Sequence, residues 1–375
     1  MTETSIPADA DSVVQPRPAV GRLPKYVAGK PPVDVPGLES FKLSSNENPL
    51  GPVPAVMDVL RTAADIHRYP DAGSTRLCAA LGEFLDVPAA DIVPGAGSLG
   101  ALNQILAAFA GQNDNGVQDE VIYAWRSFEA YPICVGLAGA KSVQVPVRED
   151  GSHDLPAMAA AVTDKTKVVL LCTPNNPTGP ALGAVETEDF ILSVPRDVVI
   201  VIDEAYQEFV RAGDAVNGVD LYRKYPNVMV LRTFSKAHGL AGLRVGYSLS
   251  QPEITQYVRA AATPFAVSGI GESAAIASME NYSQVVERVQ SLVDERDRVM
   301  AGLKDLGWDI PDAQGNFVWL PLGRNTQEFA ALAQSQALSL RAFGDDGVRV
   351  SIGEVAANSR FLEICASYTK EPRRS

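Results

Sequence analysis

Lys236 and Arg244 stand eight residues apart in a stretch that also carries a hydroxyl side chain at Ser235. The apolar run 228–231 predicts a buried strand, so Lys236 is expected close to a strand end. A lysine in a folded interior loses hydration, which lowers its pKa and leaves a neutral amine able to attack an aldehyde. The planar guanidinium of Arg244 suits a phosphate. Together these groups indicate pyridoxal phosphate chemistry, and two surface charges on a loop are the alternative.

Two further predicted strand ends carry polar side chains that this chemistry needs. The predicted strand 197–202, which is apolar from Val198 onward, leads into Asp203, and Tyr206 follows three residues later. A carboxylate at the tip of so apolar a strand is costly unless paired, and a protonated pyridine nitrogen is a suitable partner. The run 167–172 leads into a Pro/Asn/Gly cluster that contains Asn176, where ligands bind in α/β sheets. A helix N-cap for Asp203 and an ordinary turn for Asn176 are the alternatives.

The sequence Gly-Ala-Gly-Ser-Leu-Gly at 95–100 opens a predicted helix and matches a dinucleotide-binding fingerprint. That fingerprint requires a strong strand before it and an acidic residue closing a second strand about twenty residues later. Here Pro94 interrupts a short lead-in, and the acidic residues near that distance lie in the polar loop 111–120. We therefore reject a dinucleotide. Amides at a helix N-terminus bind any phosphate, so Gly97 and Ser98 are expected to hold the pyridoxal phosphate group.

In this order, these segments resemble fold-type I aminotransferases, in the branch of histidinol-phosphate and aromatic aminotransferases. The resemblance covers residues 21–370 and rests on the stretch around Lys236, the Asn-Asn-Pro-Thr-Gly motif and the succession of strand ends. It implies that Lys236, Asp203 and Tyr206 are catalytic. The pyridoxal 5'-phosphate contacts that it implies are Gly97, Ser98, Phe128, Asn176, Asp203, Tyr206, Ser235, Lys236, Arg244 and Tyr69.

The resemblance also implies a homodimer. Tyr69, in a Tyr-Pro turn, is expected to reach the cofactor phosphate of the neighbouring subunit, and an ordinary interface aromatic is the alternative. The substrate contacts that it implies are Tyr26, Asn48, Arg341 and Arg349, of which the last grips the substrate carboxylate. An arginine in such an alternating strand usually faces solvent. Asn46, in the same loop as Asn48, is expected to serve only the local backbone.

The choice of substrate rests on the stretch 125–132, with sequence Trp-Arg-Ser-Phe-Glu-Ala-Tyr-Pro. It resembles actinobacterial phenylalanine aminotransferases, as does the stretch 263–267. Phe128 is expected to stack on the pyridine ring, whereas Trp125 and Tyr131 are expected in the pocket wall or core. Phe128 replaces a tyrosine common in histidinol-phosphate enzymes, and the missing hydroxyl favours an apolar ring. The expected reaction is transamination of phenylalanine or tyrosine with 2-oxoglutarate, and histidinol-phosphate transamination is the alternative.

Other functions of the same fold are also open. A lyase or decarboxylase would keep the cofactor residues and change the product. A ligand-sensing protein would more often carry a fused DNA-binding domain, for which the chain has neither room nor charge. His238 stands where relatives often carry tyrosine, and the sequence assigns it no role.

Composition restricts the binding partners and the cellular compartment that are expected. The formal net charge of −13 argues against nucleic-acid binding, which needs clustered Lys and Arg. Four scattered cysteines and three dispersed histidines suggest neither disulfides nor a metal site, and they fit a reducing cytoplasm. The sequence has no apolar run of transmembrane length and no signal-peptide pattern at its start. A cytoplasmic protein without a membrane partner is expected.

Strands that alternate with helices predict an α/β fold. The resemblance implies a large domain with a mostly parallel seven-stranded sheet between helices, plus a smaller α+β domain. We expect a flexible tail over 1–20 and a large cofactor-binding domain over 44–270. The small domain is expected to combine 21–43 with 271–375. One long charged helix is predicted from 270 to about 302.

Overall fold

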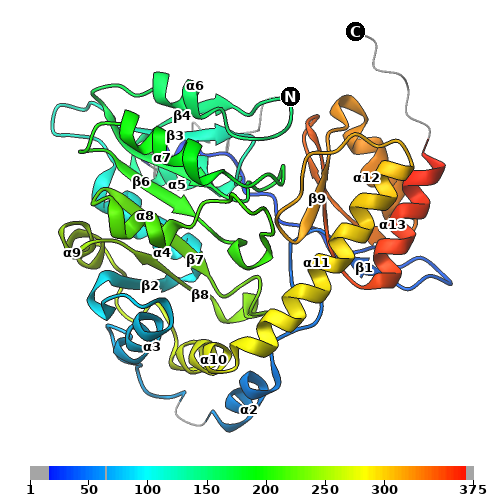
Figure 1. The fold of residues 1–375 in the computed structure, drawn as a ribbon, viewed down its shortest axis with the longest axis horizontal. Helices are drawn as coiled ribbons and strands as arrows, with labels where there is room; N and C mark the ends of the chain where they lie inside the picture. The colour runs from blue at the N-terminus through cyan, green and yellow to red at the C-terminus, as the bar shows by residue number, and fades with distance from the viewer. Residues whose placement is uncertain (1–16, 64–65, 369–375) are drawn as a thin grey trace, which may run out of the picture.

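The computed structural model describes residues 17–63 and 66–368, and a seven-stranded sheet forms its centre (Figure 1). The strand order is β2-β8-β7-β6-β5-β3-β4, and β8 runs against the other six strands. The strands are β2 (Ile92–Ala96), β3 (Glu120–Trp125), β4 (Lys141–Pro146), β5 (Thr166–Cys172), β6 (Val199–Asp203), β7 (Val228–Thr233) and β8 (Val245–Leu249). The predicted α/β fold with a mostly parallel sheet is confirmed.

Helices cover both faces of this sheet because successive side chains of a buried strand point to opposite sides. In β5, Val168 and Leu170 pack into one core and Val169 and Leu171 into another. The first core is covered by α4 (Gly97–Phe109), α5 (Ala130–Ala138) and α9 (Pro252–Ala260), and the second by α6 (Leu155–Ala160), α7 (Ala184–Ser193) and α8 (Gly218–Lys224). Beyond the β2 edge lie α2 (Pro54–Thr62) and α3 (Thr75–Leu85).

A smaller unit lies beside the sheet, on the right in Figure 1. Its three-stranded antiparallel sheet has the order β11-β12-β9, and its helices pack against that sheet and against one another. Its elements are α11 (Tyr282–Asp305), β9 (Phe317–Leu320), α12 (Thr326–Ser335), β10 (Leu338–Ser339), β11 (Arg341–Phe343), β12 (Gly347–Ser351) and α13 (Val355–Ser367). Strand β1 (Phe41–Lys42) pairs with β10, so the N-terminal segment joins this unit.

The single long helix predicted after residue 270 is wrong, since α10 (Gly269–Glu280) and α11 are separate. Asn281 between them has φ −112° and ψ 33°, and its side chain donates to the Ala277 carbonyl at 2.9 Å. Such a polar side chain competes for backbone groups and favours a helix end. Helix α10 packs on α2 and α3, whereas α11 runs diagonally into the smaller unit. We therefore propose that the large domain extends to Asn281 rather than to residue 270.

The structure also differs from simple expectation in the N-terminal segment and in the run 338–343. Residues 1–16 of the expected tail lie outside the described residues, and Pro18–Gly21 forms a one-turn helix, α1. The short run 338–343 is divided between two strands, β10 and β11, which belong to different sheets. A strand as short as β10 is defined by its partner β1, which lies far away in sequence.

The fingerprint-like glycines follow β2 at the edge of the sheet. Pro94 pairs there with Tyr247 of the antiparallel strand β8, and an edge strand tolerates a proline because one side needs no ladder hydrogen bond. The motif therefore lacks the parallel βαβ setting of a dinucleotide site.

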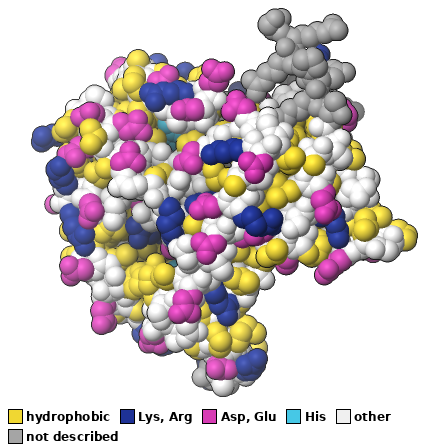
Figure 2. Space-filling model, turned by 45° about the vertical axis from the view of Figure 1, so that its right-hand side comes forward, with side chains coloured by type: hydrophobic (Ala, Val, Ile, Leu, Met, Phe, Trp, Pro, Cys, Tyr) yellow, Lys and Arg dark blue, Asp and Glu magenta, His cyan; other side chains and the backbone are white. Residues whose placement is uncertain are grey.

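Acidic and basic side chains are intermixed on the face shown in Figure 2. In the described part of the chain, no helix has the length and apolar character needed to cross a membrane. The same residues contain no group of His, Cys, Asp and Glu arranged to hold a metal ion. All four cysteines are buried free thiols.

Candidate active site

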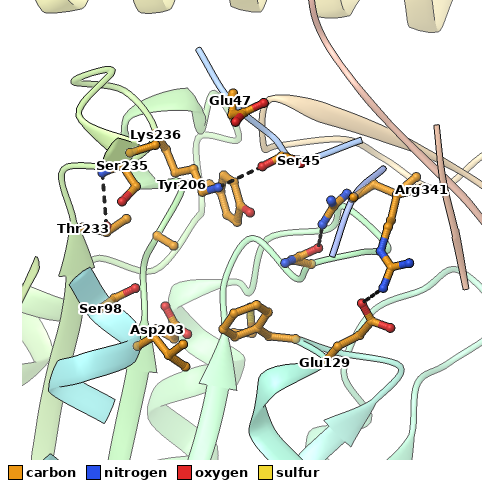
Figure 3. A pocket seen from close by; sticks show the side chains of 18 of the residues that line it. Ser45, Glu47, Ser98, Glu129, Asp203, Tyr206, Thr233, Ser235, Lys236 and Arg341 are labelled. Carbon is orange, nitrogen blue, oxygen red and sulfur yellow. Dashed lines mark hydrogen bonds and ion pairs between the residues drawn. The ribbon is translucent and has the colours of Figure 1, made fainter. Parts of the chain in front are cut away.

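Side chains from three neighbouring strands meet at one edge of the large sheet (Figure 3). Asn176 follows β5, Asp203 ends β6 and Lys236 follows β7. Carboxyl ends of parallel strands share one edge, so these residues line a common cavity of about 270 Å³. The other predicted residues that line it are Tyr26, Ser98, Phe128, Tyr206, Ser235, Arg244, Arg341 and Arg349.

Lys236 directs its amine into this cavity, above the Tyr206 ring (Figure 3). The Nζ atom donates to the Ser45 carbonyl at 3.4 Å and to the Asn46 carbonyl at 3.3 Å. Burial, together with the positive charge of Arg349, lowers the pKa of Lys236 from 10.5 to about 7. A large share of this amine is therefore neutral near pH 7, as a nucleophile or proton acceptor must be.

Asp203 is buried at the end of β6. Its Oδ2 atom accepts a hydrogen bond from the Tyr131 hydroxyl at 2.7 Å, whereas its buried Oδ1 atom has no partner. Burial raises the pKa of Asp203 from 3.8 to about 6, and the Tyr131 hydrogen bond opposes this increase. A buried acceptor without a partner costs about 1–3 kcal/mol. Because Asp203 lines the cavity, a ligand with a cationic N–H group can satisfy it.

An anion cradle lies where α4 begins. Arg244 donates from Nη1 to the Ser235 hydroxyl at 3.4 Å, and Ser98 lies in the first turn of α4. Gly97 has φ +73°, and a Cβ atom there would lie 2.4 Å from Arg244 Nη2. The Gly97 amide already donates to the Arg244 carbonyl at 3.0 Å, so Gly97 contributes space rather than the expected free amide. A helix N-terminus, a hydroxyl and a guanidinium together favour a phosphate.

Arg349 is buried on β12, with its guanidinium 5.7 Å from the Phe317 ring centre and 5.6 Å from that of Phe343. It donates from Nη1 to Asn176 Oδ1 at 2.6 Å and from Nη2 to the Ser44 carbonyl at 2.8 Å, and Nε has no partner. Burial lowers the pKa of Arg349 below its usual range. Asn176 already accepts from Arg349, so its amide nitrogen remains to donate to a ligand.

Arg341 lies directly opposite Arg349 in the register of β11 and β12. Like charges in facing positions destabilise a sheet, and Glu129 offsets this effect through an ion pair with Arg341 (Figure 3). The Arg341 guanidinium also lies 5.0 Å from the Phe343 ring centre. Tyr26 is 58% exposed and contributes a more open part of the cavity wall.

Three predicted residues, Gly97, Asn48 and Tyr69, do not line this cavity. Asn48 donates to the Ala237 carbonyl at 3.1 Å and accepts from the Leu50 amide at 2.9 Å. Its side chain is therefore occupied in fixing the loop beside Lys236, rather than directed at a substrate. Tyr69 is 85% exposed, and its ring packs against Phe265 at a centroid distance of 4.9 Å.

Two residues have a closer relation to the site than the sequence predicted. Asn46 is not limited to local backbone contacts, because its Nδ2 donates to the Tyr206 hydroxyl at 2.9 Å. The Ser351 hydroxyl holds the Asn46 Oδ1 atom at 2.9 Å. Tyr131 belongs to the core as expected, and in addition it donates to Asp203. Its position three residues after Phe128 was the available signal, and the two ring centres lie 5.6 Å apart at the start of α5.

His238 lies behind the Lys236 segment, in a second cavity of about 230 Å³. Its Nδ1 atom is 2.8 Å from the Ser278 hydroxyl, and its ring centre is 4.6 Å from that of Phe234. Burial lowers the pKa of His238 from 6.5 to about 4, so the ring is neutral at pH 7. We interpret it as a core residue.

The cavity residues fit one kind of cofactor. A neutral amine suits an aldehyde, the unpaired Asp203 oxygen suits a ring N–H group, and the Arg244 cradle suits a phosphate. All three features line the same cavity. The fold and this site together define a pyridoxal-phosphate-dependent enzyme with a mostly parallel α/β sheet.

Comparison with known families specifies the class further. The family model for class I and II aminotransferases matches residues 39–371. The chain belongs to this family, and its cofactor is pyridoxal 5'-phosphate.

Similar proteins cover nearly the whole chain. Aromatic amino acid aminotransferases from Streptomyces coelicolor and Thermobifida fusca are each 47% identical to it, over 93% and 94% of this chain and 96% and 97% of theirs. A crystal structure of histidinol-phosphate aminotransferase from Sinorhizobium meliloti, in complex with pyridoxal-5'-phosphate, is 28% identical with a TM-score of 0.79. That match covers 88% of this chain and 92% of the other.

The lowered pKa of Lys236 predicts an unusual labelling profile in cofactor-free protein. The amine reacts when neutral, so its acetylation rate should level off above pH 7, whereas that of an exposed lysine should keep rising toward pH 10.5. Brief labelling with acetic anhydride across this range, followed by peptide mass spectrometry, measures both rates. A lysine-containing model peptide added to the same sample is the reference. A Lys236 rate that increases in parallel with that of the model peptide would contradict the prediction.

Proposed function

We propose that this protein transfers the amino group of an aromatic L-amino acid, phenylalanine or tyrosine, to 2-oxoglutarate, which gives an aromatic 2-oxo acid and glutamate. The observation that carries this assignment is the 47% identity, over nearly full length, to aromatic amino acid aminotransferases. The cavity is consistent with this assignment. The Nε–H group of Arg349 has no partner and suits the α-carboxylate, and aromatic side chains line the same cavity.

Pyridoxal phosphate, when bound, supplies an aldehyde and a ring that withdraws electrons from the substrate Cα. Asp203 faces the ring nitrogen in this proposal and keeps a proton on it. The Asp203 carboxylate has an unpaired oxygen, and the Tyr131 hydroxyl orients it. Pairing with a cation stabilises the charged carboxylate and lowers its raised pKa, so Asp203 stays ionised around the neutral pH of the cell.

Lys236 first holds the cofactor and then moves the proton. Its neutral amine would be placed to take the proton from the substrate Cα and then to donate it again, first as base and then as acid. A pKa near 7 suits both steps, because an acid–base catalyst works best when its pKa is near the working pH. Tyr206, held by Asn46, and the Asn176 amide are directed at the cofactor's phenolic oxygen in this proposal.

Arg349 orients the substrate. Its Nη atoms are fixed by Asn176 and the Ser44 carbonyl, so the guanidinium is positioned before substrate arrives. A carboxylate that binds there is held by charge-assisted hydrogen bonds. This fixes which face of the amino acid Lys236 meets.

Histidinol-phosphate transamination is the second candidate. Arg341 favours it, because a guanidinium in the cavity is suited to a phosphate. The solved structure from Sinorhizobium meliloti bears that name. We rank it lower, because the relatives with higher identity are named for aromatic amino acids.

Initial rates with 2-oxoglutarate decide between the two. We expect kcat/KM for phenylalanine to exceed that for histidinol phosphate by at least about tenfold, which is ~1.4 kcal/mol in transition-state binding. A tenfold preference in the other direction would establish the second candidate. The product formed with each amino acid also tests for a lyase or decarboxylase, because these form no glutamate.

We further propose a homodimer in which Tyr69 reaches the cofactor phosphate of the other subunit. Tyr69 and Phe265 form an exposed aromatic pair beside a hollow of about 760 Å³ between α2 and α10. Exposed aromatic side chains gathered beside a hollow are typical of interaction sites.

A mixed dimer tests this sharing. Tyr69→Phe subunits and Lys236→Ala subunits, each weak or inactive alone, are unfolded together and refolded. If sites are shared, the heterodimer has one site with both lesions and one with neither, and activity should return toward half of the wild-type value per heterodimer. Mixing two preparations of the same variant is the control. No gain over the parent variants would count against sharing.

A further inference from the structure

The Arg341–Glu129 ion pair lines the same cavity, and Arg341 lies opposite Arg349 in the register of β11 and β12. The side chains of Arg341 and Glu129 are 10% and 22% exposed, and both line the cavity with Lys236. Glu129 directly precedes α5 and follows Phe128, another lining residue. In Figure 3 the Glu129 carboxylate is turned toward the Arg341 guanidinium.

The two facing arginines of β11 and β12 therefore differ in their electrostatic state. Arg349 makes no ion pair with any described residue, and its buried Nε–H group has no acceptor. Arg349 is therefore available to bind one anion. Arg341 is neutralised by Glu129, so the region around it carries little net charge.

We propose that Glu129 is a specificity-determining residue that holds Arg341 in a neutral pair, which adapts this end of the cavity to an uncharged ring and disfavours a side chain that carries a phosphate. This inference rests on the proposed function, since it concerns the same substrate site. A phosphate that approaches Arg341 meets the Glu129 carboxylate at close range. Specificity often comes from such a repulsive element as well as from attractive contacts.

The 2-oxoglutarate that takes the amino group also carries a side-chain carboxylate, and charge counting explains why Glu129 tolerates it. One carboxylate can replace another at Arg341 without adding charge there, whereas a phosphate dianion adds a charge. A second cavity, of about 430 Å³, lies on the other side of the pair. It is lined by both members of the pair, by Lys30 and by Arg126, so Glu129 has space and basic neighbours when it turns away.

Glu129→Gln tests the proposal in the intact holoenzyme, because glutamine has the same shape and no charge. We expect kcat/KM for histidinol phosphate to rise at least about tenfold and that for phenylalanine to fall about threefold, because an unpaired arginine then meets the ring. The gain should appear mainly in KM and should shrink as ionic strength increases, since added salt screens the charge.

Two further variants separate charge at this position from other effects. Glu47→Gln removes a carboxylate from the same cavity wall, but that carboxylate pairs with Lys42, so the ratio of the two kcat/KM values should change less than about threefold. In the double variant Glu129→Gln/Arg341→Gln the gain for histidinol phosphate should disappear, because the guanidinium that would bind the phosphate at position 341 is removed.

The outcomes distinguish the two proposals. A wild-type enzyme without activity on phenylalanine overturns the proposed function. A wild-type enzyme that is active on phenylalanine, with the same substrate ratio in Glu129→Gln, overturns the role of Glu129. An equal change of the ratio in Glu47→Gln also overturns it, because the effect would then reflect only the net charge of the cavity.

Discussion

Replacement of Lys236 by alanine is expected to lower kcat by about 10⁴-fold or more, the upper range for a positioned acid–base group. Lys236 is the only lysine among the described residues that line the cavity, so no other amine can replace it. The fold should persist, because the substitution removes a partly buried amine that lines a cavity rather than an apolar core residue. Initial rates of 2-oxo acid formation measure the loss, and circular dichroism checks the fold.

A separate experiment tests whether Lys236 binds the cofactor covalently. After borohydride reduction, peptide mass spectrometry should find the cofactor attached to Lys236 in the wild type and to no lysine in Lys236→Ala. Lys141→Ala is the matched control, since that lysine is exposed and pairs with Glu120 on the sheet edge away from the cavity. Cofactor that remains covalently attached in Lys236→Ala would remove Lys236 from the mechanism.

Asp203→Asn should lower kcat by roughly 10²–10³-fold, the loss typical when one pre-organised electrostatic partner is removed. The amide keeps the shape and the hydrogen bond to Tyr131, but it cannot pair with a ring cation. Affinity for the cofactor should change less, by about tenfold at most, which is ~1.4 kcal/mol, because the contacts around Arg244 remain. Single-turnover rates measure the first effect and cofactor titration the second.

Tyr131→Phe is the control for this prediction. It removes the hydroxyl that donates to Asp203 Oδ2 and keeps the carboxylate charge. We expect a loss of about tenfold, which is ~1.4 kcal/mol and lies at the lower end for a hydrogen bond to a charged group. A kcat close to the wild-type value in Asp203→Asn would contradict the role of the Asp203 charge. A greater loss of kcat in Tyr131→Phe than in Asp203→Asn would also contradict it.

The strands and the order of the site segments could be predicted from the sequence. Short apolar runs that end abruptly in polar residues identify buried parallel strands, and parallel strands bring their carboxyl ends to one edge. This reasoning placed Asn176, Asp203 and Lys236 in one cavity. It failed for the long helix after residue 270, because helical periodicity continues across Asn281 and the side-chain contact that ends the helix is local.

Neighbouring residues of one loop show where sequence reasoning stops. Asn46 and Asn48 have the same chemistry and lie two residues apart, yet Asn46 contacts Tyr206 and Asn48 contacts backbone. Asn46 has φ +52°, and Ser351 fixes its side chain. A loop conformation of this kind depends on the strand that packs against it, and composition does not encode it.

The sequence by itself determined the cofactor chemistry, because reactive groups at strand ends follow from local patterns of apolar and polar residues. Only the tertiary structure decided which arginine of β11 and β12 is neutralised by an ion pair and which is not. Arg341 meets Glu129 212 positions away, and Arg349 meets Asn176 173 positions away. Both contacts join the small unit to the large one. Their geometry depends on how the two units pack together, and ion pairs over such separations leave no periodic signal in a sequence.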